Sequence, residues 1–294
     1  MELRHLQYFL MIAREGTISG AAQALHLSQP SLSRQMHDLE CELGCKLFNR
    51  GSRHIELTEA GMRLRSRAEK IVDLVGRTES EFLVSADMLA GEVRIGGGET
   101  PAMALVADVV AELQSAHPLL RFALHSGNAA DVSERLDNGR IDFGVFVGHT
   151  NLDRYESLRL PAHDRWGAFM RQDDPLAALD AVRPEDLQDK PLIFSAQAGH
   201  EMQAWFRRDA AELDIVATYN LLYNASLLAR RGVGYVISLD GIVDTGPGSG
   251  LTFRPLDPAV TADIFIAWKR YQTFSAAAEA FLRRIRELWG SSRR

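Results

Sequence analysis

Residues 21–50 decide the fold of this chain, and they read AAQALHLSQPSLSRQMHDLECELGCKLFNR. The segment predicts two short helices joined by a tight turn at His26-Leu27, with Ser28 placed to cap the second helix. Pro30 falls in the first turn of that helix, where its missing N–H breaks no intrahelical bond. Four apolar residues recur at helical spacing and are expected to be buried: Leu32, Met36, Leu39 and Leu43. This pattern is typical of a helix-turn-helix, whose second helix enters the major groove of DNA.

The polar face of the second helix carries the candidate DNA contacts. A turn of about 100° per residue places four side chains opposite the apolar face: Pro30, Ser31, Arg34 and His37. Gln29 lies at the helix tip, within reach of base edges, and Arg34 suits guanine or phosphate. Taken alone, Ser31, Ser33 and Arg34 are more typical of a solvated helix face. The pattern around them favours DNA contact.

A short basic hairpin follows the second helix. Ile55 and Leu57 alternate as in a strand, and Gly51-Ser52 makes a turn. We expect this hairpin to be a wing that also meets the DNA. Its basic residues have distinct expected roles, with Lys46 and Arg50 at phosphates and Arg53 in the minor groove.

The N-terminal motifs resemble those of the LysR-type bacterial transcriptional regulators. The resemblance rests on these residues in order: Ala21-Ala22, Ser28-Gln29-Pro30-Ser31-Leu32-Ser33, Leu39-Glu40, Leu43-Gly44, Leu47-Phe48, Arg50 and Leu57-Thr58-Glu59-Ala60-Gly61. It implies a winged helix-turn-helix with Arg53 near the minor groove. The residues expected at DNA are therefore Ser28, Gln29, Pro30, Ser31, Ser33, Arg34, His37, Lys46, Arg50 and Arg53.

The charge is unevenly distributed along the chain. The net charge is −6, but residues 1–77 hold 11 Lys/Arg and 9 Asp/Glu, whereas residues 78–294 hold 22 and 30. The acidic remainder argues against a non-specific nucleic-acid coat and fits DNA contact at one end only. The sequence shows no apolar signal stretch and no span of transmembrane length, which predicts a cytoplasmic protein without a membrane partner.

Two cysteines, Cys41 and Cys45, stand four residues apart near the end of the second helix. This spacing puts both on one helix face, so a metal pair or a redox switch is one interpretation. A zinc site needs further ligands, and only His37 lies close by in sequence. We therefore expect packed or part-exposed thiols, with no metal and no cofactor.

A long helix is predicted between the two parts of the chain. From Thr58 to Leu89 there is no proline, and Gly61 and Gly76 are the only glycines. Apolar residues follow the spacing of a coiled-coil seam: Leu64, Ala68, Ile71, Val75, Thr78 and Phe82. A helix of about thirty residues with such a narrow stripe is hard to keep as a monomer. Burial against the chain's own larger domain is one explanation, and the resemblance implies another, a linker that pairs two subunits.

Strands alternate with helices from residue 91 onward. The pattern predicts strands at 93–96, 121–125, 141–147, 165–170, 191–194, 215–219, 234–238 and 264–268, and helices at 102–115, 130–138 and 276–289. Such alternation indicates an α/β domain with a mostly parallel sheet covered on both faces. The resemblance, looser here, implies two subdomains like those of periplasmic binding proteins, with a small-molecule cleft between them.

The expected domains follow from these patterns and the resemblance. Residues 1–58 form the winged helix-turn-helix, 59–90 the linker helix and 91–294 the effector-binding domain. Subdomain I spans about 91–161 and 267–294, and subdomain II about 162–266. The chain is expected to cross near Leu160 and to return near Ala267.

The candidate effector site lies beyond the carboxyl ends of the strands, where parallel sheets bind ligands. Thr100 is expected as N-cap and Pro101 as first residue of a helix whose free N–H groups would receive an anion. Glu99 beside it disfavours a carboxylate effector and leaves a cationic or neutral one open. The expected effector contacts are Thr100, Ser126, Asn128, Ser195 and Gln197, although simple capping explains these polar residues nearly as well.

The motifs give no support for an enzyme. Gly96-Gly97-Gly98 lacks the Lys-Ser/Thr of a P-loop, there is no Gly-x-Ser-x-Gly elbow, and the nine histidines form no zinc-type cluster. We expect an effector-responsive regulator that binds promoter DNA as a homodimer or homotetramer, with RNA polymerase left open as a further partner. The alternatives are a constitutive DNA-binding repressor and a solute-binding protein with a vestigial DNA-binding domain.

Overall fold

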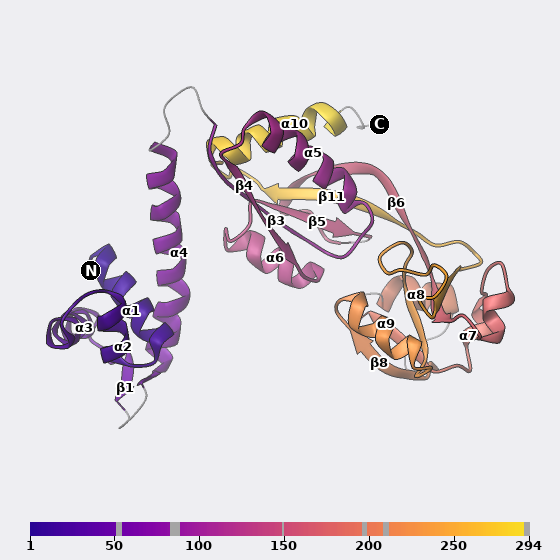
Figure 1. The fold of residues 1–294 in the computed structure, drawn as a ribbon, viewed down its shortest axis with the longest axis horizontal. Helices are drawn as coiled ribbons and strands as arrows, with labels where there is room; N and C mark the ends of the chain where they lie inside the picture. The colour runs from indigo at the N-terminus through magenta and orange to yellow at the C-terminus, as the bar shows by residue number, and fades with distance from the viewer. Residues whose placement is uncertain (51–54, 83–88, 149, 196–198, 208–211, 291–294) are drawn as a thin grey trace. The chain divides into compact units, whose positions relative to one another are not determined.

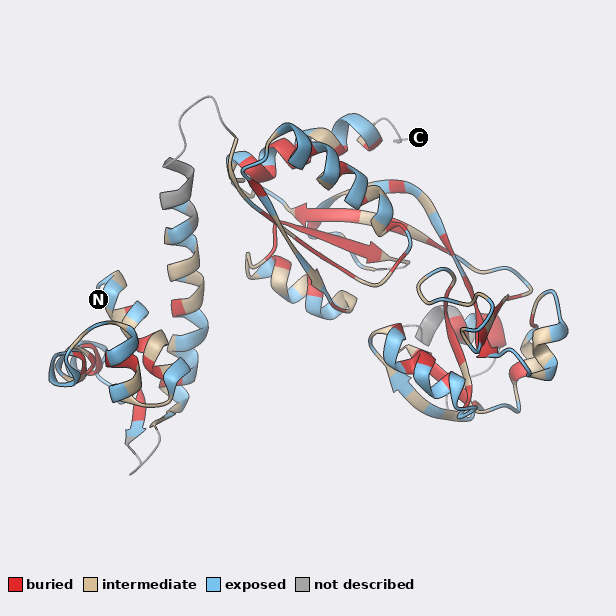
Figure 2. Ribbon diagram, viewed as in Figure 1, coloured by how far each residue is buried: buried red, intermediate tan, exposed pale blue. Residues whose placement is uncertain are grey.

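The computed structural model describes residues 1–50, 55–82, 89–148, 150–195, 199–207 and 212–290. The chain divides into two compact units, Met1–Ser85 and Ala86–Arg294 (Figure 1). Each unit has its own buried core, which appears as red segments in Figure 2. Within the described ranges, no helix is both long and apolar enough to cross a bilayer.

The first unit is the predicted helix-turn-helix with its hairpin. Its elements are α1 (Leu3–Glu15), α2 (Ile18–Ala24), α3 (Gln29–Leu43), β1 (Phe48–Arg50), β2 (Ile55–Leu57) and α4 (Glu59–Phe82). The Ser28 hydroxyl accepts a hydrogen bond from the backbone N–H of Ser31 at the start of α3, as a cap does. Gly44, with a φ of 67°, ends the helix in the left-handed conformation.

The apolar face of α3 packs into the core of this unit. Leu32, Met36 and Leu39 are buried there with Phe9 of α1, whose ring lies 5.2 Å from that of Phe48. The expectation that Leu43 is buried too was wrong, because its side chain is 38% exposed. Leu43 is the last residue of the helix, beyond the turns that face α1 and α2.

Helix α4 uses only part of its predicted seam within the first unit. Ala68 is fully buried in the core of this unit, and Leu64 and Val72 pack partly against it. Two larger apolar side chains further along α4, Ile71 and Leu74, remain exposed. The start of the predicted seam is therefore buried within the chain itself, whereas Ile71 of the seam and Leu74 beside it are exposed.

The second unit is an α/β domain built on a nine-stranded mixed sheet. The strands are β3 (Gly91–Gly97), β4 (Leu120–Ser126), β5 (Phe143–Val147), β6 (Tyr155–Arg171), β7 (Leu192–Ser195), β8 (Ile215–Tyr219), β9 (Tyr235–Leu239), β10 (Leu251–Pro255) and β11 (Thr261–Lys269). Their order is β4-β3-β5-β11-β6-β9-β7-β8, and β10 pairs with β6. The helical segments are α5 (Met103–Ala116), α6 (Ala129–Asp137), a short 3₁₀ turn (Pro175–Ala178), α7 (Pro184–Leu187), α8 (Gly199–Phe206), α9 (Leu222–Arg230) and α10 (Ala276–Trp289).

The sheet is parallel at its two ends and antiparallel in its middle. Strand β3 pairs in parallel with β4 and β5, and β7 pairs in parallel with β8 and β9. Between these two groups, β6 and β11 run antiparallel along most of their length. The expectation of a mostly parallel sheet was therefore wrong for the central strands. β6 leads from the first subdomain to the second and β11 leads back, so these two paired strands run in opposite directions.

Two apolar cores define the two subdomains of this unit. In the first, α5 and α10 cover one face of the sheet and α6 covers the other (Figure 1). Along β6, Leu160 belongs to the first core and Trp166 to the second. Along β11, Ala262 belongs to the second core and Ile264 to the first. The chain therefore returns to the first subdomain before residue 264, whereas the expected position was near Ala267. The other domain boundaries stay predictions.

Candidate DNA-binding surface and ligand cleft

The N-terminal half of α3 and its cap form a row of exposed polar side chains. Six of the expected DNA contacts are exposed in the structure: Ser28, Gln29, Pro30, Ser31, Arg34 and His37. Ser33 is half-buried beside Leu32, so it faces DNA less directly than its neighbours. The buried apolar face of α3 fixes which way this row points. Contact of these residues with DNA stays a prediction.

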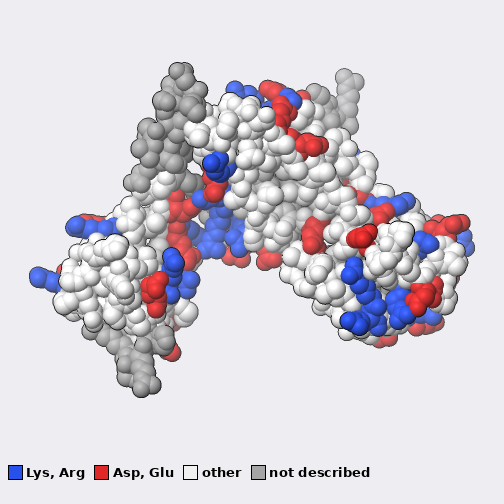
Figure 3. Space-filling view, in the orientation of Figure 1, with Lys and Arg blue, Asp and Glu red and all other residues white. Residues whose placement is uncertain are grey.

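The charge of the first unit is nearly balanced, as its sequence indicates. Its visible face in Figure 3 is mostly uncharged, with a few acidic and basic side chains interspersed. The net charge of residues 1–77 is only slightly positive, so charge alone does not identify this unit as a DNA binder.

A buried carboxylate anchors the end of α3 to the start of the hairpin. Glu40 is 6% exposed, and its Oε1 accepts a hydrogen bond from the backbone N–H of Leu47 at 2.9 Å. Its Oε2 accepts one from Lys46 Nζ at 2.8 Å. Burial alone would raise the pKa of Glu40, but the bonds from Lys46, Leu47 and Phe48 outweigh it and lower the pKa. Lys46, expected at a phosphate, is thus an ion-pair partner whose side chain remains largely exposed.

The remaining candidate residues of the first unit are the two hairpin arginines and the two cysteines. Arg50 ends β1, but its side chain lies outside the described structure, as does the whole of Arg53. Cys41 and Cys45 are both free and exposed, and Cys41 Sγ lies 3.6 Å from His37 Nε2. Among the described residues, no cluster of three or more His, Cys, Asp or Glu side chains could hold a metal ion.

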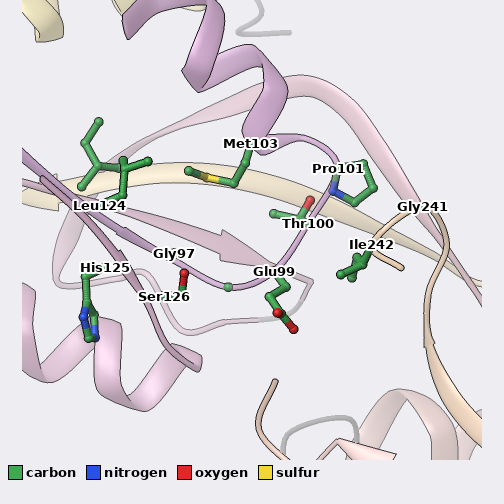
Figure 4. A pocket seen from close by; sticks show the side chains of 12 residues that line it. Gly97, Glu99, Thr100, Pro101, Met103, Leu124, His125, Ser126, Gly241 and Ile242 are labelled. Carbon is green, nitrogen blue, oxygen red and sulfur yellow. The ribbon is translucent and has the colours of Figure 1, made fainter. Parts of the chain in front are cut away.

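A cavity of about 330 Å³ lies beyond the carboxyl ends of β3 and β4 in the second unit (Figure 4). Its lining comes from both subdomains: Ile95, Gly97, Gly98, Glu99, Thr100, Pro101, Met103, Leu124, His125, Ser126, Gly241 and Ile242. The two subdomains approach closely here, because a Cβ on Gly241 would lie 3.0 Å from Pro101 Cγ. Only glycine fits at this position, where φ is also +77°.

Two of the five expected effector contacts line this cavity, Thr100 and Ser126. Asn128 and Ser195 are not among its described lining residues. Ser195 is half-buried at the end of β7, and Gln197 lies outside the described residues. The prediction that all five residues contact an effector remains untested.

Thr100 is held in place by contacts on both sides of its hydroxyl group. The hydroxyl donates a hydrogen bond to Asp164 Oδ2 on β6, and it accepts one from the backbone N–H of Ala102 at 3.0 Å. Burial raises the pKa of Asp164, and the bond from Thr100 offsets only part of this effect. Nothing in the sequence pattern pointed to Asp164, which is 64 residues away from Thr100.

The expected anion site at the start of α5 differs from the observed geometry. The helix begins at Met103 rather than at Pro101, and Thr100 stabilises the preceding turn. Four successive N–H groups at this end already have partners: Ala102 bonds the Thr100 hydroxyl, and Met103, Ala104 and Leu105 bond the carbonyls of Thr100, Pro101 and Ala102. They are therefore not the free donors that the sequence suggested.

Glu99 reaches across to the second subdomain. Its Oε2 accepts a hydrogen bond from the backbone N–H of Leu222, the first residue of α9. A carboxylate at a helix N-terminus is favourable because it meets unpaired N–H groups and the positive end of the helix dipole. Figure 4 shows Glu99 and Thr100 pointing in opposite directions from the loop after β3. Neighbouring residues thus contact two different elements, α9 and β6.

Asn128 acts as the N-cap of α6. Its Oδ1 accepts a hydrogen bond from the N–H of Asp131 at 2.9 Å, and the Asp131 carboxylate accepts one from the N–H of Asn128. We expect Asn128→Ala to lower stability by about 1 kcal/mol, the usual cost of a lost cap. Thermal unfolding measures this, with Glu134→Ala as a control at an exposed position of the same helix. A variant with unchanged stability would contradict the capping role.

The chain matches two family models that together span most of its length. The model described as "Bacterial regulatory helix-turn-helix protein, lysR family" matches residues 3–62. The model described as "LysR substrate binding domain" matches residues 86–290. The order of the two matches is that of the two structural units.

Whole proteins with similar sequences are named as transcriptional regulators. The uncharacterized HTH-type transcriptional regulator YvbU of Bacillus subtilis is 28% identical over 296 residues, which cover 99% of this chain and 100% of YvbU. The HTH-type transcriptional regulator TfdT of Cupriavidus pinatubonensis is 33% identical over 202 residues, or 66% of this chain and 85% of TfdT.

Solved structures share the fold over nearly the whole chain. Full-length CbnR in complex with its target DNA has a TM-score of 0.78 at 23% identity and covers 98% of this chain and 99% of CbnR. A full-length OxyR variant from Pseudomonas aeruginosa has a TM-score of 0.60 at 22% identity, with 97% and 98% covered. With both family models matched in this order, the chain belongs to the LysR family of bacterial DNA-binding transcriptional regulators.

Proposed function

We propose that this regulator binds promoter DNA as a dimer, and as paired dimers, and that a small molecule in the cleft of the second unit controls it. One observation carries the DNA-binding part of this proposal: α3 presents exposed polar side chains at its N-terminal half while its opposite face is buried. A helix of this kind fits the major groove without placing large apolar groups against bases. A promoter-binding regulator works where the chromosome is, so we place the protein in the bacterial cytoplasm.

The roles of the DNA-facing residues follow from their chemistry. Gln29 suits adenine and Arg34 suits guanine, because each side chain can form two hydrogen bonds to one base edge. The short side chains of Ser28, Pro30 and Ser31 allow the helix tip to come close to the backbone of the DNA. Lys46, Arg50 and Arg53 would add phosphate and minor-groove contacts from the hairpin.

The control by a small molecule is supported by the contacts around the cleft. Glu99 bonds the start of α9, Thr100 bonds β6, and Pro101 touches the loop at Gly241. A ligand in the adjoining cavity would alter these contacts and so favour one relative placement of the two subdomains. In a dimer on DNA, such a shift changes the spacing between the two copies of α3.

Arg34→Ala tests the DNA-binding part of the proposal. We expect the affinity for a promoter fragment to fall about 5- to 150-fold, since one base-reading arginine contributes about 1–3 kcal/mol. Fluorescence anisotropy at one fixed salt concentration measures this, with the region upstream of the protein's own gene and a scrambled fragment as the two DNAs.

The matched control for this experiment is Arg4→Ala. Arg4 is exposed and lies on α1 near the amino terminus, which contacts Glu42 at the far end of α3. If Arg34→Ala weakens binding to both DNAs equally, the arginine contacts phosphate rather than bases. If it binds the promoter as tightly as the unchanged protein and Arg4→Ala do, Arg34 has no role at the DNA.

A further inference from the structure

We propose that the cleft selects a small organic cation, an ammonium group on a compact apolar body, as its ligand. This inference rests on the proposed function, since it names the chemical class of the molecule that the cleft takes. It is drawn from the charges, the hydrogen bonds and the size of the cavity around Glu99.

The charged groups that line the cavity favour a cation. Glu99 is the acidic residue of the described lining, and neither lysine nor arginine is found in that lining. His125 also lines the cavity, and its pKa is lowered by burial first and by Arg135 second, so the imidazole is neutral at pH 7. A ligand with a carboxylate would bring a second negative charge next to Glu99, and neither lysine nor arginine lines the described cavity to offset it.

At two helix starts beside the cavity, N–H groups that an anion would need are already in use. The N–H groups at the start of α5 are bonded to Thr100, Pro101 and Ala102. The first N–H of α9, that of Leu222, is bonded to Glu99. Helix N-termini receive anions through such unpaired groups. These particular N–H groups are therefore already bonded within the chain.

The Glu99 carboxylate is available to a cation as a partner. Oε2 is used by the N–H of Leu222, and the described lining around Glu99 contains neither lysine nor arginine. An ammonium group next to this carboxylate would form a charge-assisted hydrogen bond without displacing Leu222.

The rest of the cavity sets the size and character of the ligand body. Met103, Leu124 and Ile242 supply apolar surface to the cavity, and Glu99 and Ser126 supply polar groups. A volume of 330 Å³ holds about ten water-sized groups, at roughly 30 Å³ for each water. A compact amine such as one with a single ring or a short branched chain fits this space.

Three probes of nearly equal shape and different charge test the class of ligand. Benzylamine is a cation at pH 7.5, benzoate is an anion, and benzyl alcohol is neutral. We expect benzylamine to raise the melting temperature of the full-length protein in a concentration-dependent way, because a ligand that binds the fold stabilises it. Benzoate should give no shift, and benzyl alcohol should bind at least tenfold more weakly than benzylamine.

Glu99→Gln shows whether the Glu99 carboxylate causes the preference for a cationic ligand. The amide oxygen can still accept the bond from Leu222, so the fold is retained while the charge is lost. We expect the Kd for benzylamine, measured by calorimetry, to rise about 10-fold or more, and the difference between benzylamine and benzyl alcohol to disappear. Glu134→Gln, an exposed acid on α6, is the matched control and should bind like the unchanged protein.

Ser126→Trp separates failure of this inference from failure of the proposed function. Ser126 is exposed and lines the cavity, so a tryptophan there fills the space without disturbing the core. If benzoate binds and Ser126→Trp prevents it, the cleft is a ligand site but the cationic class is wrong. If benzylamine binds Glu99→Gln and Ser126→Trp unchanged, it binds elsewhere and the inference is overturned. If no amine, acid or alcohol of this size binds up to 100 mM, the small-molecule control itself is contradicted.

Discussion

Leu74→Glu is expected to turn the proposed dimer into a monomer. Leu74 is 58% exposed on α4 next to Ile71, so the folded chain leaves an apolar surface on a helix that has no further partner within the first unit's core. Pairing of two copies along α4 would bury each leucine, which contributes about 1.5–3 kcal/mol. A symmetric dimer loses this twice, about 3–6 kcal/mol. The dimer Kd should therefore rise about 10²- to 10⁴-fold.

Sedimentation velocity over a range of protein concentrations measures this change. Glutamate is a good helix former, so α4 itself should persist, and circular dichroism checks that it does. The matched control is Met62→Glu, because Met62 is also 58% exposed on α4. Met62 precedes Leu74 by twelve residues, which at about 100° per residue places it about 120° away from Leu74 around the helix. If Leu74→Glu is dimeric at the same protein concentrations as Met62→Glu, the subunits associate through another surface.

The helix-turn-helix was predictable because its signals are local. Ser28 caps α3, as its position in the sequence indicated, and Gly44 ends the helix. The apolar spacing of Leu32, Met36 and Leu39 identified the buried face, and hence the exposed one. Each of these signals depends on residues within one or two helical turns, so no long-range pairing had to be inferred.

The central part of the large sheet was predicted less well. The sequence suggested a strand at 165–170, whereas β6 runs from Tyr155 to Arg171 and pairs with β11 about a hundred residues later. The first half of β6 has no regular alternation of buried and exposed positions and includes Pro161 and charged residues, which masks its strand character. Its direction relative to β11 depends on how the chain returns between the subdomains, and no local pattern encodes that.

The position of the candidate ligand site could be predicted from the sequence, but the contacts that shape the site could not. The ends of β3 and β4 marked the correct edge of the sheet, and Thr100 and Ser126 do line the cavity. The contacts that shape the site join distant residues: Glu99 and Leu222 are 123 positions apart. From the sequence, Glu99 was only a charge that disfavours anions. The structure shows that its carboxylate also accepts a hydrogen bond from the first N–H of α9.

Glu40→Ala is expected to destabilise the DNA-binding unit by about 2–4 kcal/mol. Removing the carboxylate leaves the N–H of Leu47, a fully buried residue, without its partner, which costs about 1–3 kcal/mol. The charge-assisted bond from Lys46 is lost as well, but Lys46 is exposed and regains water, so this part is smaller. Glu40→Gln keeps an acceptor for Leu47 and should cost less than Glu40→Ala.

The cost of Glu40→Gln should depend on pH in a defined direction. The pKa of Glu40 is lower in the folded protein than its ordinary value of 4.5. The ionised carboxylate therefore adds stability that is fully present above pH 4.5 and is lost as the pH falls through the folded-state pKa. We expect the difference between the unchanged protein and Glu40→Gln to be largest at pH 7 and to shrink below pH 4.5. Glu42→Gln, a half-exposed neighbour on α3, should show little effect at pH 7.

Urea unfolding followed by two signals assigns the effect to the correct unit. All four tryptophans, Trp166, Trp205, Trp268 and Trp289, lie in the second unit, so their fluorescence reports on that unit alone. Circular dichroism at 222 nm also follows the helices of the first unit. Glu40→Ala should shift an early transition in dichroism and leave the tryptophan transition in place. Equal shifts of both signals would mean that the two units unfold together, and no shift would mean that Glu40 does not hold the hairpin to α3.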